Sequence, residues 1–178
     1  MKINHTPLEG VLVVEPEKYK DERGYFSETF SRKDYDDLGI INKFVQDNHS
    51  FSKKGVLRGL HFQKKNPQGK LVRCASGSVL DVVVDINVES KTLGEHFSIV
   101  LSAENSKQLW IPPGYAHGFL VISDFADFMY KCTEYFHPDD QCGIVWDDPI
   151  LNIKWPEENP IISIKDKSLQ SFEDFLKT

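Results

Sequence analysis

The chain has 178 residues, of which 40% are hydrophobic and 27% charged, and we expect one soluble domain over residues 1–178. Its net charge of −6 argues against nucleic acid as the main partner, because nucleic-acid-binding surfaces are basic. The three cysteines have no CxxC spacing, which argues against a disulfide scaffold. The chain has no run of about 18 apolar residues and no signal-peptide pattern, so we expect a cytoplasmic protein without a membrane partner.

Short segments rich in Val, Ile and Phe predict an all-β protein. They are separated by turn residues such as Asp21–Gly24, Asn66–Gly69, Ser76-Gly77 and Pro112–Gly114. Many short strands at regular spacing are typical of a sandwich or a barrel. In chain order, the predicted strands are Val11–Glu15, Tyr25–Phe30, Lys43–Ser50, Val56–Gln63, Lys70–Ala75, Ser78–Ile86, Glu95–Leu101, Gln108–Ile111, Gly118–Ile122, Phe125–Cys132 and Gly143–Trp146.

Only two helices are predicted. The first covers Ser31–Leu38 and ends at Gly39, and the second covers Leu169–Lys177 with Ser168 as its N-cap. Because strands and helices do not alternate along the chain, a Rossmann or TIM-barrel architecture is disfavoured.

Two predicted strands carry polar residues that suit a ligand better than solvent. Gln46, Asn48 and Ser50 share one face of their strand and present short hydroxyl and amide groups, with an edge strand that has a polar face as the alternative explanation. On another strand, Glu28 lies between Phe26 and Phe30, where a carboxylate is costly unless a cation or a ligand hydroxyl meets it.

The positive charges are concentrated in one stretch. Residues 48–80 contain no acidic residue and include Arg58, His61 and Lys70. A histidine with its usual pKa of about 6.5 can accept a proton at neutral pH, and the two cations would stabilise a phosphate or a developing oxyanion. Taken alone, His61 is better explained as a buried structural histidine, but its cationic neighbours favour a site. The positions of Arg58 and His61 on one strand indicate a bulge near Gly59.

Further along the chain, His117 follows a rigid turn and Tyr130 lies on a strand. A tyrosine hydroxyl, with a usual pKa of about 10, can act as an acid toward a carbanion or enolate, whereas aromatic packing is the alternative role. Metal binding by His61, Gln63 and His117 is a competing explanation, but a His-x-His pair followed by a glutamate and a distant histidine is missing. No HExxH, P-loop, GxGxxG or GxSxG motif supports hydrolysis, nucleotide hydrolysis or hydride transfer.

Motifs spread from Gly10 to Asp166 carry a specific resemblance. They are Asp21-x-Arg23-Gly24-x-Phe26-x-Glu28, Gln46-x-Asn48-x-Ser50, Leu57–Gln63, Gly69–Arg73, Pro113-Gly114-x-Ala116–Phe119, Tyr130-Lys131, Trp146–Pro149 and Trp155-Pro156. In order and spacing they resemble the dTDP-4-dehydrorhamnose 3,5-epimerase family. The resemblance implies a cupin-type jelly-roll double-stranded β-helix with short peripheral helices, a homodimer, and neither a metal nor another cofactor.

The same resemblance implies an activity. Members of the family invert C3 and C5 of dTDP-4-dehydro-6-deoxy-D-glucose to give dTDP-4-dehydro-L-rhamnose, on the pathway to dTDP-L-rhamnose, a donor for cell-surface polysaccharide. The ketone at C4 acidifies the hydrogens on C3 and C5. Inversion therefore needs a base on one face of the sugar ring and an acid on the other.

Roles for individual residues also follow from the resemblance. His61 is expected to be the base, Asp166 to orient it, and Tyr130 to return the proton, while Lys70 stabilises the enolate oxygen. The residues expected to bind the nucleotide sugar are Arg23, Phe26, Glu28, Gln46, Asn48, Arg58, Lys70 and His117, with Arg23 and Phe26 reaching across the dimer.

Two departures from the family pattern leave alternatives open. Asn87 replaces a common arginine, and Gln141 replaces a common glutamate, which could change the preferred nucleotide sugar without altering the proton chemistry. The alternatives are an epimerase that inverts only C3 or only C5, a metal-dependent cupin, and a non-catalytic sugar-binding cupin. The intact set of His61, Lys70, Tyr130 and Asp166 speaks against the last.

Overall fold

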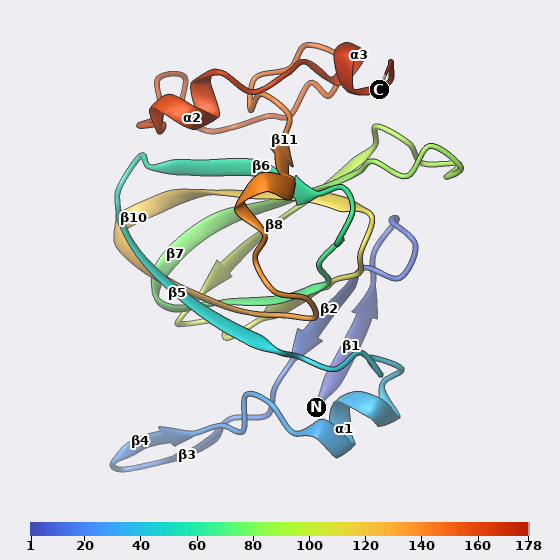
Figure 1. Ribbon diagram of the computed structural model, residues 1–178. Helices are drawn as coiled ribbons and strands as arrows, with labels where there is room; N and C mark the ends of the chain where they lie inside the picture. Colours follow the sequence, from blue (N-terminus) through green and yellow to red (C-terminus); the bar gives the residue numbers. More distant parts are fainter. Residues whose placement is uncertain (178) are drawn as a thin grey trace.

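One large antiparallel β-sheet curls into a barrel and dominates the computed structural model, which describes residues 1–177 (Figure 1). Its strand order is β1-β2-β9-β7-β10-β6-β11, with β5 paired to β10 and β8 paired to β7. This confirms the expected all-β, cupin-type fold. The strands are β1 Lys2–His5, β2 Leu12–Glu15, β3 Tyr19–Asp21, β4 Gly24–Phe26, β5 Gln46–Lys53, β6 Leu57–Gln63, β7 Lys70–Asp85, β8 His96–Ser102, β9 Gln108–Ile111, β10 Tyr115–Cys132 and β11 Gln141–Gly143.

The two longest strands, β7 and β10, each replace a pair of shorter predicted strands. The turn expected at Ser76-Gly77 is instead a bend within β7, where Gly77 has a φ of 74°. A Cβ atom at Gly77 would lie 1.9 Å from the carbonyl oxygen of Phe125, so only glycine allows the two strands to cross this closely. Opposite it, the pairing of β10 shifts register between Val121 and Ala126. The predicted turn residues therefore do bend the chain, but the bend is a bulge within a continuous strand and not the end of the strand.

The helices are short and peripheral. Helix α1 (Arg32–Asp37) confirms the first prediction, whereas α2 (Ile164–Lys167) was not predicted and α3 (Phe172–Phe175) is shorter than expected. The predicted cap at Ser168 was wrong, because the hydroxyl of Ser171 accepts the Asp174 N–H and caps α3 instead. A 3₁₀ turn covers Pro138–Asp140. No helix within residues 1–177 is long and apolar enough to cross a membrane.

The barrel is closed by packing on both of its outer surfaces. At the N-terminal side, Tyr35 of α1 is fully buried against Leu12, Val14 and Trp110. At the other side, the chain after β11 folds back over the sheet and buries Phe172. Burial of a large apolar side chain such as this one contributes roughly 1.5–3 kcal/mol to the free energy of unfolding. These two layers leave the opening between β5, β6 and β10 as the accessible part of the barrel interior.

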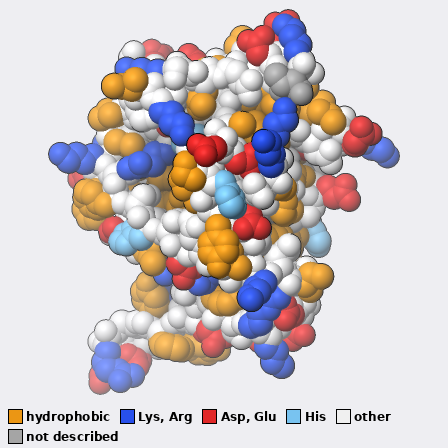
Figure 2. Space-filling model, viewed as in Figure 1, with side chains coloured by type: hydrophobic (Ala, Val, Ile, Leu, Met, Phe, Trp, Pro, Cys, Tyr) orange, Lys and Arg blue, Asp and Glu red, His pale blue; other side chains and the backbone are white. Residues whose placement is uncertain are grey.

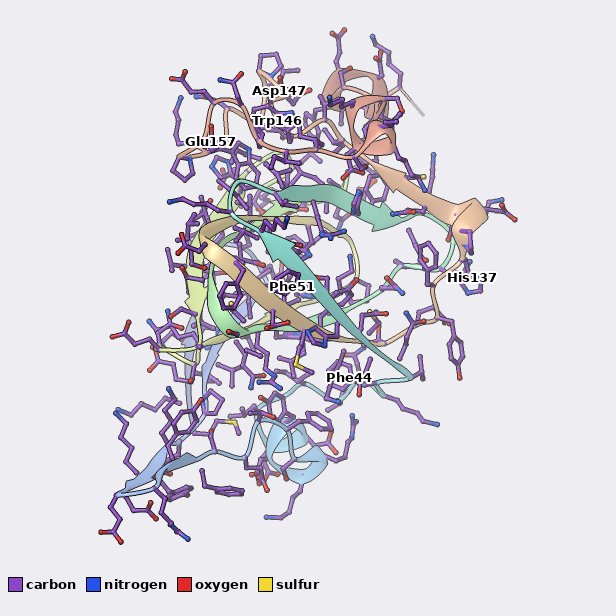
Figure 3. The ribbon with its side chains drawn as sticks, turned by 90° about the vertical axis from the view of Figure 1, so that its left-hand side faces the viewer. Phe44, Phe51, His137, Trp146, Asp147 and Glu157 are labelled. Atoms are coloured by element: carbon purple, nitrogen blue, oxygen red, sulfur yellow. The ribbon has the colours of Figure 1, made fainter. Side chains whose placement is uncertain are left out.

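One hairpin does not join the barrel. Strands β3 and β4 pair only with each other and project away from the rest of the chain in both ribbon views (Figures 1 and 3). Tyr25 and Phe26 are 57% and 69% exposed, and Figure 2 shows charged side chains at the hairpin tip. An isolated two-stranded hairpin is marginally stable in water, so this arm is expected to rest against another surface.

Candidate active site

The barrel interior contains a pocket of about 640 Å³, formed by β5, β6, β7 and β10 and by the C-terminal segment that includes α2. On β5, residues 46, 48 and 50 face inward and alternate with exposed neighbours, which confirms the predicted polar face. Eight of the eleven predicted site residues line this pocket: Gln46, Asn48, Arg58, His61, Lys70, His117, Tyr130 and Asp166.

His61 and Asp166 form a hydrogen-bonded pair although they are 105 residues apart in the chain. The Nε2 atom of His61 lies 2.7 Å from Oδ1 of Asp166, which leaves Nδ1 of the ring for a substrate. Burial alone would raise the pKa of Asp166, but hydrogen bonds from His61 and from the Gly59 N–H outweigh burial and hold that pKa below its usual value. The carboxylate is therefore charged at neutral pH and holds the imidazole ring in a fixed orientation by its hydrogen bond.

A bulge in β6 and the cap of α2 create this geometry. Between His61, which pairs with His117, and Arg58, which pairs with Phe119, β6 contains one extra residue relative to β10. Gly59 provides the bulge, because it has a φ of 130° and a Cβ there would lie 2.5 Å from the Cα of Gly118. The expected bulge is confirmed, and it lets Arg58 and His61 both face the pocket.

Asp166 is held by its own backbone. Its N–H donates to the Ser163 hydroxyl at 3.0 Å, which fixes the first turn of α2. The helix has only four residues and shows no apolar period, so local sequence patterns do not reveal it.

Lys70 and Tyr130 bring a cation and a phenol into the same pocket. Lys70 is 9% exposed, and burial lowers the pKa of its ammonium, while the charges of Cys132 and Asp81 oppose that change. Burial raises the pKa of Tyr130, so its hydroxyl carries a proton at neutral pH. The pocket therefore holds a group that can stabilise a negative oxygen and a group that can donate a proton.

A second His–Asp pair lies in the pocket wall. The Nε2 atom of His117 is 2.9 Å from Oδ2 of Asp81, and both side chains are buried. Asp81 was not among the predicted site residues. Its sequence position did carry a signal, since it is a lone carboxylate within the apolar run Val79–Val84, where a charge is found only when it has partners.

The three remaining predicted residues lie on or beside the projecting arm. Arg23 forms an exposed ion pair with Asp21 at 2.6 Å, and Phe26 and Glu28 are exposed. None of the three lines the pocket of its own chain. Arg23 and Phe26 were expected to reach across a dimer, so their roles stay predictions, as does that of Glu28.

The two departures from the family pattern have different surroundings. Gln141 lies in the pocket wall, where its Oε1 accepts a hydrogen bond from the Nζ of Lys165 at 2.6 Å. Asn87 follows the end of β7 outside the pocket, and its N–H donates to Oδ1 of Asp85. Only Gln141 is therefore placed to affect the substrate.

The side chains that the competing explanation assigns to a metal have other partners. The Gln63 amide donates to the carbonyl of Asn66 at 2.7 Å, and its oxygen accepts the His137 N–H. Within residues 1–177, no group of three or more His, Cys, Asp or Glu side chains could hold a metal ion. These contacts give no support to the competing explanation, metal ligation by His61, Gln63 and His117.

A second, smaller cavity of about 280 Å³ lies in the C-terminal segment. Trp146, Asp147 and Glu157 line it (Figure 3), and it contains none of the predicted site residues.

The barrel and its main pocket define the class of protein, a cupin-type fold with acid–base side chains in the barrel interior. Within that class, the chain belongs to the dTDP-4-dehydrorhamnose 3,5-epimerase family, whose sequence profile matches residues 5–174.

Individual relatives span almost the whole chain. A dTDP-4-dehydrorhamnose 3,5-epimerase from Escherichia coli (strain K12) is 48% identical over 180 residues, which cover 99% of this chain and 97% of the relative. The structure of a dTDP-6-deoxy-D-glucose-3,5-epimerase from Legionella pneumophila, in complex with dTDP-4-keto-L-rhamnose, has a TM-score of 0.94 at 48% identity and covers 97% and 93% of the two chains. A 3′-monoepimerase from Streptomyces bikiniensis in complex with dTDP-quinovose has a TM-score of 0.90 at 28% identity and covers 97% and 88%.

Proposed function

We propose that this chain inverts C3 and C5 of dTDP-4-dehydro-6-deoxy-D-glucose to give dTDP-4-dehydro-L-rhamnose, within the cytoplasmic synthesis of dTDP-L-rhamnose. The observation that carries the proposal is the placing of the His61–Asp166 pair, Lys70 and Tyr130 in one pocket. Family membership and the relatives, at 48% identity, support the dual activity over a single-centre one, because the monoepimerase is only 28% identical.

Each inversion is a proton transfer in two steps. His61 takes the hydrogen from the carbon beside the C4 ketone, and the electron pair of that C–H bond moves to the ketone oxygen to form an enolate. Lys70 stabilises the enolate oxygen, an effect that is stronger in a buried pocket than in water. Tyr130 then donates its proton to the other face of the carbon, and solvent restores the tyrosine and histidine protonation states.

The test is incubation with dTDP-4-dehydro-6-deoxy-D-glucose in deuterated water, with and without a chelator. We expect deuterium at both C3 and C5 of the product, at the same rate in both conditions. Label at only one carbon would make this a single-centre epimerase. Loss of activity with the chelator would contradict the metal-independent mechanism.

We also propose that the working form is a homodimer in which the arm of one subunit covers the pocket of the other. The arm exposes Tyr25 and Phe26, and it presents Arg23 and Glu28 away from the pocket of its own chain. The pocket, which Gln46 helps to line, is only partly enclosed and would leave part of a bound nucleotide open to solvent. An arginine suits the diphosphate, and an exposed aromatic ring suits the nucleobase, so the partner's arm would complete the substrate site.

Tyr130→Phe separates proton removal from proton return, since it removes only the hydroxyl. We expect net epimerisation to fall by about 10²- to 10⁴-fold, the usual contribution of a general acid. Deuterium exchange with retained configuration should fall by about tenfold or less, because His61 can return the exchanged proton to the face from which it came. NMR of the recovered substrate and product measures both rates. An equal fall in the two rates would contradict a role for Tyr130 in the return step alone.

Gln141→Glu tests the contribution of the pocket wall to substrate binding. The new carboxylate would pair with Lys165 and neutralise a positive charge in the wall of the pocket that is proposed to take a dianionic diphosphate. We expect KM to rise about 2- to 5-fold, as for a charge pair worth up to ~1 kcal/mol, with kcat within about twofold. The difference should shrink at high salt. Gln141→Leu, which adds no charge, is the matched control, and an unchanged KM in the glutamate variant would rule out this effect.

A further inference from the structure

Asp81 is a buried carboxylate with an incomplete set of partners. It lies on the inner face of β7 between Val79 and Val83, and all three side chains are 0% exposed. One carboxylate oxygen contacts Nε2 of His117, but the other, Oδ1, has no hydrogen-bond partner within residues 1–177. A buried carboxylate is costly unless it is paired or faces positive charge, so this position requires an explanation beyond the fold.

The two polar side chains nearest Asp81 explain its position. His117 and Lys70 are 7% and 9% exposed, and both line the main pocket. Within the described part of the chain, the Lys70 ammonium forms no hydrogen bond or ion pair of its own, although the charge of Asp81 acts on it. The Lys70 ammonium can therefore bind a ligand oxygen, while the negative charge of the buried Asp81 offsets part of its positive charge.

We propose that Asp81 is a positioning residue of this active site: it fixes the proton of His117 on Nε2 and provides the negative charge against which Lys70 is held. The inference rests on the proposed function, in which Lys70 meets the enolate oxygen. Asp81 itself does not touch the substrate, because its side chain is fully buried.

The two His–Asp pairs would then have different tasks. His61 and His117 are direct cross-strand partners on β6 and β10. The side chain of His61 is 26% exposed and that of His117 is 8% exposed, so His61 is the more accessible of the two histidines. Asp166 orients the base His61. Asp81 instead positions His117 and Lys70, the donors proposed to lie around the ketone oxygen.

Asp81→Asn in the full-length protein tests the inference, since it keeps the shape but removes the charge. We expect kcat to fall by roughly 10- to 100-fold, with the Kd for dTDP changed by less than about threefold. The alkaline limb of the kcat–pH profile should move to lower pH, because the Lys70 ammonium loses the carboxylate that favours it. The other titratable or charged side chains around Lys70 are retained in this variant: Arg58, His61, His117, Tyr130, Cys132, Lys165 and Asp166.

The matched control is Asp85→Asn. Asp85 is on the same strand and is also fully buried, but its carboxylate accepts hydrogen bonds from Ser90 and Thr92 outside the pocket. Its replacement should lower stability without moving the alkaline limb. An unmoved limb in Asp81→Asn, or equal movement in both variants, would overturn the proposal.

Nitrogen-15 NMR of the imidazole rings gives a second readout that needs no turnover. In the wild-type protein, His117 should carry a proton on Nε2, and in Asp81→Asn this preference should be lost. A wild-type His117 protonated only on Nδ1 would overturn the inference even if the variant failed to fold. If the wild-type protein exchanged no deuterium into the substrate, the proposed function would fail, whereas the proton position on His117 would still report on Asp81.

Discussion

His61→Ala is expected to lower kcat by about 10³-fold and to stop deuterium exchange at both C3 and C5. No other side chain in the pocket is placed to replace the base, because Asp166 is buried behind it and the Nε2 atom of His117 is engaged by Asp81. Since exchange reports on proton removal alone, its loss assigns the first step to His61. This pattern differs from the one expected for Tyr130→Phe, in which exchange persists.

The chain offers a matched control for this experiment. His49 and Asp127 form a second kind of His–Asp pair at 2.7 Å, but it lies on the outer side of β5 and β10 with the imidazole about half exposed. We expect His49→Ala to keep wild-type kcat, because an exposed pair of this kind contributes little to stability and does not line the pocket. Wild-type exchange in His61→Ala would remove the assignment of the base, whatever the effect on stability.

Much of the barrel follows from local sequence patterns. The inward face of β5 was predicted correctly because polar residues at every second position show where a strand meets a ligand. The bulge in β6 was predicted because Arg58 and His61 cannot both face the pocket on a regular strand. In these cases the information lies within a few residues, and the structure adds only the partner strands.

Other features depend on contacts between distant segments. β7 and β10 continue through their glycine and serine turns because each bend is paired with a bulge on the other strand, and a single sequence does not display that pairing. Asp166 reaches His61 only after the C-terminal chain folds back over the sheet, so the resemblance to a family, and no local pattern, pointed to it. Asp81 is an isolated carboxylate in an apolar strand, and only the folded chain shows that His117 lies beside it.

Two impaired variants are expected to restore activity to each other when they form mixed dimers. The first is His61→Ala, and the second combines Arg23→Ala with Phe26→Ala on the arm. Loss of a charge-assisted hydrogen bond to the diphosphate costs about 1.5–3 kcal/mol, so the arm variant alone should lose roughly 10- to 100-fold in kcat/KM. In a mixed dimer with crossed arms, one pocket has both defects, and the other has an intact His61 covered by the intact arm of the His61→Ala subunit.

The mixed dimer should therefore reach about half the wild-type activity, whereas both parent dimers remain far below it. If each arm instead served the pocket of its own chain, every pocket in the mixture would keep one defect and no activity would return. His61→Ala mixed with Tyr130→Phe is the matched control, because both residues belong to the pocket of a single chain and neither arrangement restores it. Co-expression with two affinity tags isolates the mixed species, and light scattering gives its mass. A monomer would contradict the crossed arm directly, since the exposed Tyr25 and Phe26 would then need another surface to cover them.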